Sequence, residues 1–239
     1  MSGEIHFDLK AIFDFRAKQS VTQTLMCIVS PGDQVIIPAP YWPSYPDMVK
    51  MCSATPVILA TYAEDDYLIN PSELRRCLES HSQVKALILC NPSNPTGGVA
   101  GEDILRKIAE VLEDFPNVIV IADEIYEQLT YETEHCSFGS LPNMLKRTVT
   151  INGFSKSHSM TGYRIGYSAS ATDIAKGSSK LQSQMTSCAS SIGQEAALVA
   201  LRDVPNSWMA EKRSELIAKR DEAYSLISSI PKVFVFPLL

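Results

Sequence analysis

The stretch VKALILCNPSNPTGG, residues 84–98, joins a nearly continuous apolar run to a turn with two prolines and two glycines. A short apolar run bounded by turn residues is typical of a strand that is covered on both faces of a sheet. Asn91 and Asn94 follow the run, in an irregular turn where an asparagine amide can face the sheet edge. The stretch therefore predicts a buried strand with polar side chains at its carboxyl end.

Similar runs occur along the rest of the chain and alternate with helical patterns. This alternation predicts an α/β fold of three layers, a mostly parallel sheet flanked by helices, whose ligands bind beyond the carboxyl ends of the strands. The predicted strands cover 34–40, 55–60, 84–90, 117–123, 148–153 and 163–170, and the predicted helices cover 18–29, 71–80, 101–114, 174–202 and 206–229.

Composition excludes several classes of protein. The 239 residues carry a net charge of -6, which argues against a nucleic-acid partner, and no apolar run is long enough to span a membrane. The six cysteines form no CxxC pair, which favours free thiols over a disulfide framework or a metal site. The first residues, MSGEIHFDLK, show no targeting segment.

A second strand end carries ionisable groups. The run NVIVIADEIY, residues 117–126, places Asp123, Glu124 and Tyr126 after apolar residues, so a carboxylate and a phenol can project into one crevice. One alternative is that Asp123 caps a helix. Another is the magnesium-binding strand of a P-loop ATPase, but the chain has no GxxxxGK[ST] motif.

A third strand end carries a lysine, in NGFSKSHSMTGYR, residues 152–164. A lysine amine becomes a nucleophile when desolvation or nearby positive charge favours its neutral form, and Lys156 has Arg164 close by in sequence. A solvated surface lysine is the alternative. Together with Asn94, Asp123 and Tyr126, the pattern indicates pyridoxal 5′-phosphate, which needs a lysine Schiff base, an acidic partner for its ring nitrogen and a cation for its phosphate.

With these residues the sequence resembles the fold-type I, class I/II aminotransferases, in the branch of aspartate and prephenate aminotransferases. The resemblance implies three parts: a non-family segment over 1–15, a large cofactor-binding domain over 16–205, and a linking helix with the start of a truncated small domain over 206–239. The motifs that carry it are AKQS (17–20), SPGDQVIIPAPYWPSYP (30–46), NPSNPTG (91–97), ADEIYEQLTY (122–131), NGFSKSHSMTGYRIGY (152–167) and SSIGQEAAL (190–198).

The resemblance implies catalytic roles for three of these residues. Lys156 would form the Schiff base with the cofactor and move a proton to and from the substrate, and Asp123 would keep the pyridine nitrogen protonated. Tyr126 and Asn94 would hydrogen-bond the phenolic oxygen of the ring, with Asn94 also near the substrate.

It implies binding roles for others. Trp42 would stack on the cofactor ring and border the substrate, although an aromatic at this place is also an ordinary core residue. Arg164 would grip the phosphate, with a structural ion pair as the alternative. Lys18 would face the side-chain carboxylate of a dicarboxylic substrate, or else lie solvated at a helix start. Ala17 and Ser155 would contact the cofactor phosphate from a backbone amide and a hydroxyl.

The sequence also departs from the family. Arg16 stands where the family has a phosphate-contacting glycine, and we expect the dihedral angles of that glycine to conflict with an arginine Cβ. Residues 1–15 do not match, although IHFDLKAIFDF can mimic the missing strand. By the resemblance, this sequence is expected to lack much of the small domain, including the arginine that clamps the substrate carboxylate. We therefore keep two expectations: an aminotransferase core, or a cofactor-binding chain without turnover that acts only through dimer contacts.

The implied substrates are an amino acid such as aspartate or glutamate and a 2-oxo acid. Family active sites lie at a two-fold dimer interface, so a homodimer is expected. The expected compartment is the cytoplasm or, by resemblance to plant relatives of the prephenate type, the plastid stroma.

Overall fold

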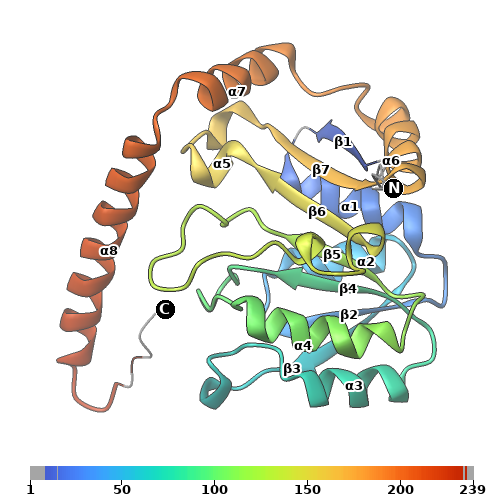
Figure 1. The fold of residues 1–239 in the computed structure, drawn as a ribbon, viewed down its shortest axis with the longest axis horizontal. Helices are drawn as coiled ribbons and strands as arrows, with labels where there is room; N and C mark the ends of the chain where they lie inside the picture. Colours follow the sequence, from blue (N-terminus) through green and yellow to red (C-terminus); the bar gives the residue numbers. More distant parts are fainter. Residues whose placement is uncertain (1–8, 15, 234, 236–239) are drawn as a thin grey trace, which may run out of the picture.

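A seven-stranded sheet forms the centre of the computed structural model, which describes residues 9–14, 16–233 and 235 (Figure 1). The strands lie in the order β1-β7-β6-β5-β4-β2-β3. Strand β7 is antiparallel to both of its neighbours, and the pairs among β2 to β6 are parallel. The strands are β1 (Leu9–Asp14), β2 (Gln34–Ala39), β3 (Thr55–Ala60), β4 (Val84–Cys90), β5 (Ile119–Asp123), β6 (Thr148–Gly153) and β7 (Gly166–Ala171).

Helices cover both faces of this sheet, which confirms the predicted three-layer α/β fold. Helices α1 and α2 pack on one face, and α3 and α4 pack on the other (Figure 1). The helices are α1 (Ala17–Ile28), α2 (Ser44–Met51), α3 (Pro71–Ser80), α4 (Glu102–Glu113), α5 (Phe154–Ser157), α6 (Thr172–Met185), α7 (Ser191–Asp203) and α8 (Asn206–Ser228).

Alternation along the central strands divides the core between the two faces. In β4, Leu87 and Leu89 contact the α3–α4 layer, whereas Ala86 and Ile88 contact the α1–α2 layer. This is the period-two pattern of a strand buried on both sides. In β5 the same alternation puts Ile121 on the α1–α2 face, so Asp123, two residues later, lies on that face as well.

Two helical predictions differ from the structure. The predicted helix over 174–202 is wrong as a single element, because α6 and α7 are separate helices. Between them Ser187 adopts a left-handed φ of 62°, and the Ser190 side chain accepts a bond from the Gly193 N–H to begin α7. Helix α2 was not predicted, because prolines usually argue against a helix. Pro43 and Pro46 are tolerated here because they fall at the start of α2, where backbone N–H groups have no helical partner.

The N-terminal prediction concerns a strand. IHFDLKAIFDF was expected to mimic the strand that precedes AKQS, and β1 confirms this for Leu9–Asp14, which pairs antiparallel with β7. Residues 1–8 and 15 lie outside the described residues. Because β1 ends at the sheet edge where β4, β5 and β6 also end, it delivers the start of α1 to that edge.

Helix α8 leads away from the sheet (Figure 1). Of its residues only Met209 is buried, and the helix agrees with the predicted range of 206–229. Of the small-domain start expected within 206–239, residues 234 and 236–239 lie outside the described residues. Across the described part of the chain, no helix has both the length and the apolar character that crossing a bilayer requires.

Phe138 provides a test of the core on the α3–α4 face. Its side chain is 1% exposed and packs in the larger apolar cluster. We expect Phe138→Ala to lower the free energy of unfolding by about 3–5 kcal/mol, because a large buried ring leaves a cavity. Urea denaturation measures this, and Met51→Ala is the control, since Met51 is 76% exposed. Equal effects of the two substitutions would contradict the described packing.

Candidate active site

A cavity of about 310 Å³ lies at the carboxyl edge of the sheet and collects every predicted site residue. Such a volume suits a small organic ligand. The predicted residues that line it are Ala17, Lys18, Trp42, Asn94, Asp123, Tyr126, Ser155, Lys156 and Arg164. Its lining also includes five residues that were not predicted as site residues: Arg16, Tyr45, Cys90, Ile125 and Thr161.

The direction of the strands explains this convergence. Strands β4, β5 and β6 are parallel, so the residues at or just after their carboxyl ends, including Asn94, Asp123 and Lys156, meet at one edge. Strand β7 runs the opposite way, so Arg164, which precedes it, lies at the same edge. The Lys156 side chain belongs to the short helix α5, directly after β6. The prediction that Lys156 and Asp123 share one cavity is confirmed.

Asp123 is the buried carboxylate of the cavity, and it caps no helix. Its Oδ2 accepts a bond of 2.7 Å from the Tyr45 hydroxyl, and its Oδ1 accepts one of 3.4 Å from the Ile125 N–H. Burial raises the pKa of the Asp123 carboxyl above its ordinary value, and these two bonds oppose the rise. Burial and the nearby Asp123 also raise the pKa of the Cys90 thiol, to about 12, so this thiol stays protonated.

Tyr126 connects the strand ends of β4 and β5. Its hydroxyl accepts a bond of 3.3 Å from the Asn94 side-chain amide. The Lys156 Nζ lies 5.5 Å from the centre of the Tyr126 ring. Burial raises the pKa of the Tyr126 phenol, so it is a neutral hydrogen-bonding group at neutral pH. The amine, the phenol and the amide therefore form one wall of the cavity.

Trp42 and Lys18 form another wall. The Lys18 Nζ lies 4.5 Å from the centre of the Trp42 ring and donates a bond of 3.3 Å to the Ser44 Oγ. This cation–π contact holds a half-buried lysine at the cavity rather than free in solvent. The Trp42 ring meets the Tyr45 ring edge-on, with centroids 5.4 Å apart.

Two arginines line the cavity beside the start of α1. Arg164 has a left-handed φ of 55° and donates a bond to the Thr161 carbonyl. Arg16, expected to strain the backbone in place of glycine, has φ of -179° and ψ of 160°. This extended conformation is open to any residue, so the expected conflict with an arginine Cβ does not arise. The close approach is instead made by Gly166, where a Cβ would lie 2.4 Å from the Ala17 nitrogen.

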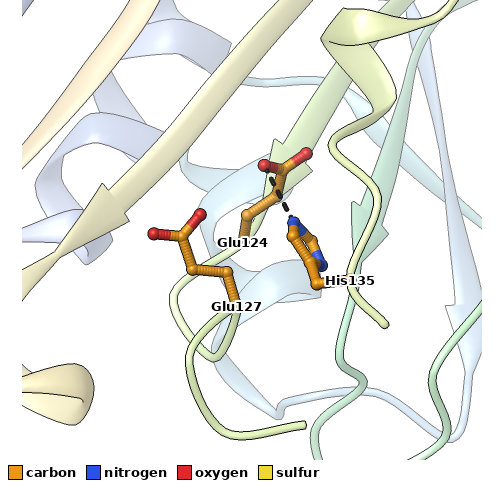
Figure 2. Close-up of side chains that lie close together, drawn as sticks. All are labelled: Glu124, Glu127 and His135. Atoms are coloured by element: carbon orange, nitrogen blue, oxygen red, sulfur yellow. Dashed lines mark hydrogen bonds and ion pairs between the residues drawn. The ribbon is translucent and has the colours of Figure 1, made fainter. Parts of the chain in front are cut away.

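Glu124 is not among the residues that line the cavity, and its side chain points toward His135 (Figure 2). Its carboxylate accepts bonds of 3.0 Å from the Ser137 hydroxyl and the Phe138 N–H, and one contact of 3.3 Å to His135 Nε2. Glu127 lies beside them, with ligand atoms of Glu124, Glu127 and His135 within 4.8 Å of one another. The bonds that Glu124 already accepts give it a structural role, anchoring the loop that leads to Phe138.

We expect Glu124→Gln to lower the free energy of unfolding by about 1–3 kcal/mol, because an amide cannot accept from all of these buried donors. Glu124 is 2% exposed, so water cannot replace the lost bonds. Urea denaturation of Glu124→Gln and of Glu127→Gln, the less buried neighbour, provides the comparison. Equal losses would assign the effect to charge alone.

The family model described as "Aminotransferase class I and II" matches residues 16–237. The chain belongs to this family. This confirms the family expected from the motifs.

Relatives of known sequence are aspartate and prephenate aminotransferases. The bifunctional aspartate aminotransferase and glutamate/aspartate-prephenate aminotransferase of Petunia hybrida is 50% identical over 77% of this chain and 38% of its own length. The aspartate aminotransferase of Bacillus subtilis is 38% identical over 90% of this chain and 54% of its own length. The chain therefore spans about half, or less, of the length of these relatives.

Solved structures of aminotransferases share the fold. The aspartate aminotransferase of Rhizobium meliloti has a TM-score of 0.88 at 33% identity and covers 93% of this chain and 55% of its own. The aromatic aminotransferase of Pyrococcus horikoshii has a TM-score of 0.89 at 33% identity, covering 97% of this chain and 61% of its own.

Proposed function

We propose that this chain is the core of an aminotransferase that uses pyridoxal 5′-phosphate to move an amino group between an amino acid, such as aspartate or glutamate, and a 2-oxo acid. The observation that carries the proposal is the convergence of Lys156, Asp123 and Tyr126 on one cavity. The names of the relatives support the substrate class.

The lining of the cavity fits this cofactor. Asp123 is a buried carboxylate whose pKa is raised, and a protonated pyridine nitrogen beside it would supply the missing positive charge. Arg164, with the hydroxyl of Ser155 and the backbone N–H of Ala17, would hold the phosphate. Arg16 adds a second guanidinium at the start of α1.

The remaining residues would act on the ring and on the substrate. Bound pyridoxal phosphate serves as an electron sink that lowers the barrier to removing a proton from the substrate α-carbon. Lys156 holds the cofactor and moves that proton with its amine. Trp42 offers a flat face for the ring, and Asn94 with Tyr126 offers hydrogen bonds for its phenolic oxygen.

Reconstitution with pyridoxal phosphate tests the proposal. We expect a yellow protein in which borohydride fixes the cofactor on Lys156, as peptide mass spectrometry would show. Addition of glutamate or aspartate should then shift the absorbance of an unreduced sample. Failure to fix the cofactor would overturn the proposal, whereas fixation without a shift would select a cofactor-binding chain without turnover.

Lys18 is proposed to select dicarboxylic substrates. We expect Lys18→Ala to weaken binding of succinate about ten- to a hundredfold, because a charge-assisted bond to the distal carboxylate is lost. Binding of the monocarboxylate propionate should change much less. Both are measured by titrating the absorbance of the loaded protein, with exposed Lys50→Ala as the control. Equal weakening for both acids would remove Lys18 from this role.

The proposed organisation follows the same family. Residues 16–205 would form the cofactor-binding domain, and 206–239 would lead into a second domain; the single buried residue of α8 supports this division. A homodimer is proposed from the family, and exposed apolar residues on α7, including Ile192 and Leu201, support an interface there.

A further inference from the structure

Tyr45 occupies a position at the cavity that the motifs did not assign. It belongs to α2, is 2% exposed, and its hydroxyl donates the 2.7 Å bond to Asp123 Oδ2. The Ile125 N–H bonds the other oxygen, Oδ1, so one donor reaches each oxygen of the carboxylate. Two donors on two oxygens fix the rotation of a carboxylate and leave further lone pairs to accept from a ligand.

We propose that Tyr45 is a positioning residue that holds the Asp123 carboxylate ionised and correctly turned to pair with a protonated ring nitrogen in the cavity. This inference rests on the proposed function. It differs from a purely structural role, because a tyrosine that only filled space would not need its hydroxyl on Asp123.

The surroundings of Asp123 make this bond important. Besides Tyr45, the ionisable groups that act on it are Cys90 from β4 and Glu124, the residue directly after β5. Lys156 and Tyr126 line the same cavity. Burial and the negative charge of Glu124 both favour the neutral carboxyl, whereas the Tyr45 hydroxyl favours the carboxylate. Cys90 is a neutral thiol and adds no positive charge.

The same segment also places Trp42. The Trp42 and Tyr45 rings meet edge-on, three residues apart around the start of α2, so one short segment carries both the proposed stacking residue and the donor to Asp123. Tyr45→Phe keeps this ring contact and removes only the hydroxyl, which isolates the hydrogen bond.

The test follows the protonation of the ring directly. Protein loaded with ¹⁵N-labelled pyridoxal phosphate is first shown by borohydride treatment of a sample to hold it on Lys156. The ¹⁵N chemical shift of the unreduced sample then reports whether the ring nitrogen carries a proton. We expect a protonated nitrogen in the unmodified protein and in Tyr41→Phe, the matched tyrosine control from the segment just before α2, and an unprotonated reference in Asp123→Asn.

In Tyr45→Phe the acid dissociation constant of the Asp123 carboxyl should fall about ten- to a hundredfold, which makes it a weaker acid. The ¹⁵N shift should then move toward the Asp123→Asn value. A fully protonated nitrogen in Tyr45→Phe would overturn the inference. So would an unprotonated nitrogen in the unmodified protein, a measurement that holds even where the variant does not fold. Absence of cofactor on Lys156 in the unmodified protein would instead overturn the proposed function.

Discussion

Lys156→Arg is expected to abolish covalent fixation of pyridoxal phosphate and to lower amino-group transfer by at least about two to four orders of magnitude. Arginine keeps a positive charge at the cavity but forms no Schiff base and does not exchange a proton at neutral pH. The variant therefore separates the nucleophilic amine from a merely electrostatic lysine. Fixation is measured by borohydride reduction and mass spectrometry, and transfer by formation of the 2-oxo acid.

The matched control for this prediction is Lys176→Arg, at an exposed position on α6. It should fix the cofactor as the unmodified protein does. Retained fixation in Lys156→Arg, with the label mapped to another lysine, would show that the amine beside Tyr126 is not the attachment point.

Asp123→Asn is expected to weaken binding of pyridoxal phosphate and amino-group transfer by about two to four orders of magnitude. The reason is that removing one partner of a buried ion pair costs about 3–5 kcal/mol. Asparagine keeps the shape of the side chain and removes the negative charge that would face the ring nitrogen. Equilibrium binding of the cofactor, followed by quenching of tryptophan fluorescence, measures the first effect.

Although Asp123→Asn should weaken cofactor binding, it should not lower the stability of the cofactor-free protein. Because the folded pKa of Asp123 is raised, its carboxyl favours folding below the ordinary value of 3.8, and this contribution is lost as pH rises through the raised value. Asp123→Asn removes that loss, so the cofactor-free variant should be no less stable than the parent at neutral pH. Glu127→Gln is the charge-matched control. A large loss of stability in cofactor-free Asp123→Asn would make Asp123 a structural residue instead.

Much of the site could be predicted because its residues sit in short motifs at strand ends. Asn94, Asp123 and Lys156 each follow an apolar run, and the carboxyl ends of parallel strands share one edge. Tyr45 was missed because its significance depends on how α2 packs. Its bond to Asp123 joins residues 78 positions apart. The break between α6 and α7 was missed because the left-handed turn at Ser187 leaves a weak pattern in the sequence.

At Arg16 the sequence predicted a conflict that the structure does not contain. The sequence raised a conflict between its Cβ and a glycine conformation, but its extended φ removes that conflict. The close approach between β7 and α1 falls on Gly166 instead. Which residue must be small depends on the neighbours brought against it, and local sequence does not contain that information.

By itself, the sequence determined the type of most elements, the alternation of strand and helix, and the chemical groups that stand at the strand ends. These follow from local periodicity and residue type, which act over a few positions. Only the tertiary structure decided that β1 and β7 join the same sheet, that α2 brings Tyr45 onto Asp123, and that one cavity receives all of these groups. The physical reason is that strand order and helix packing depend on contacts between distant residues, whose energies no local pattern expresses.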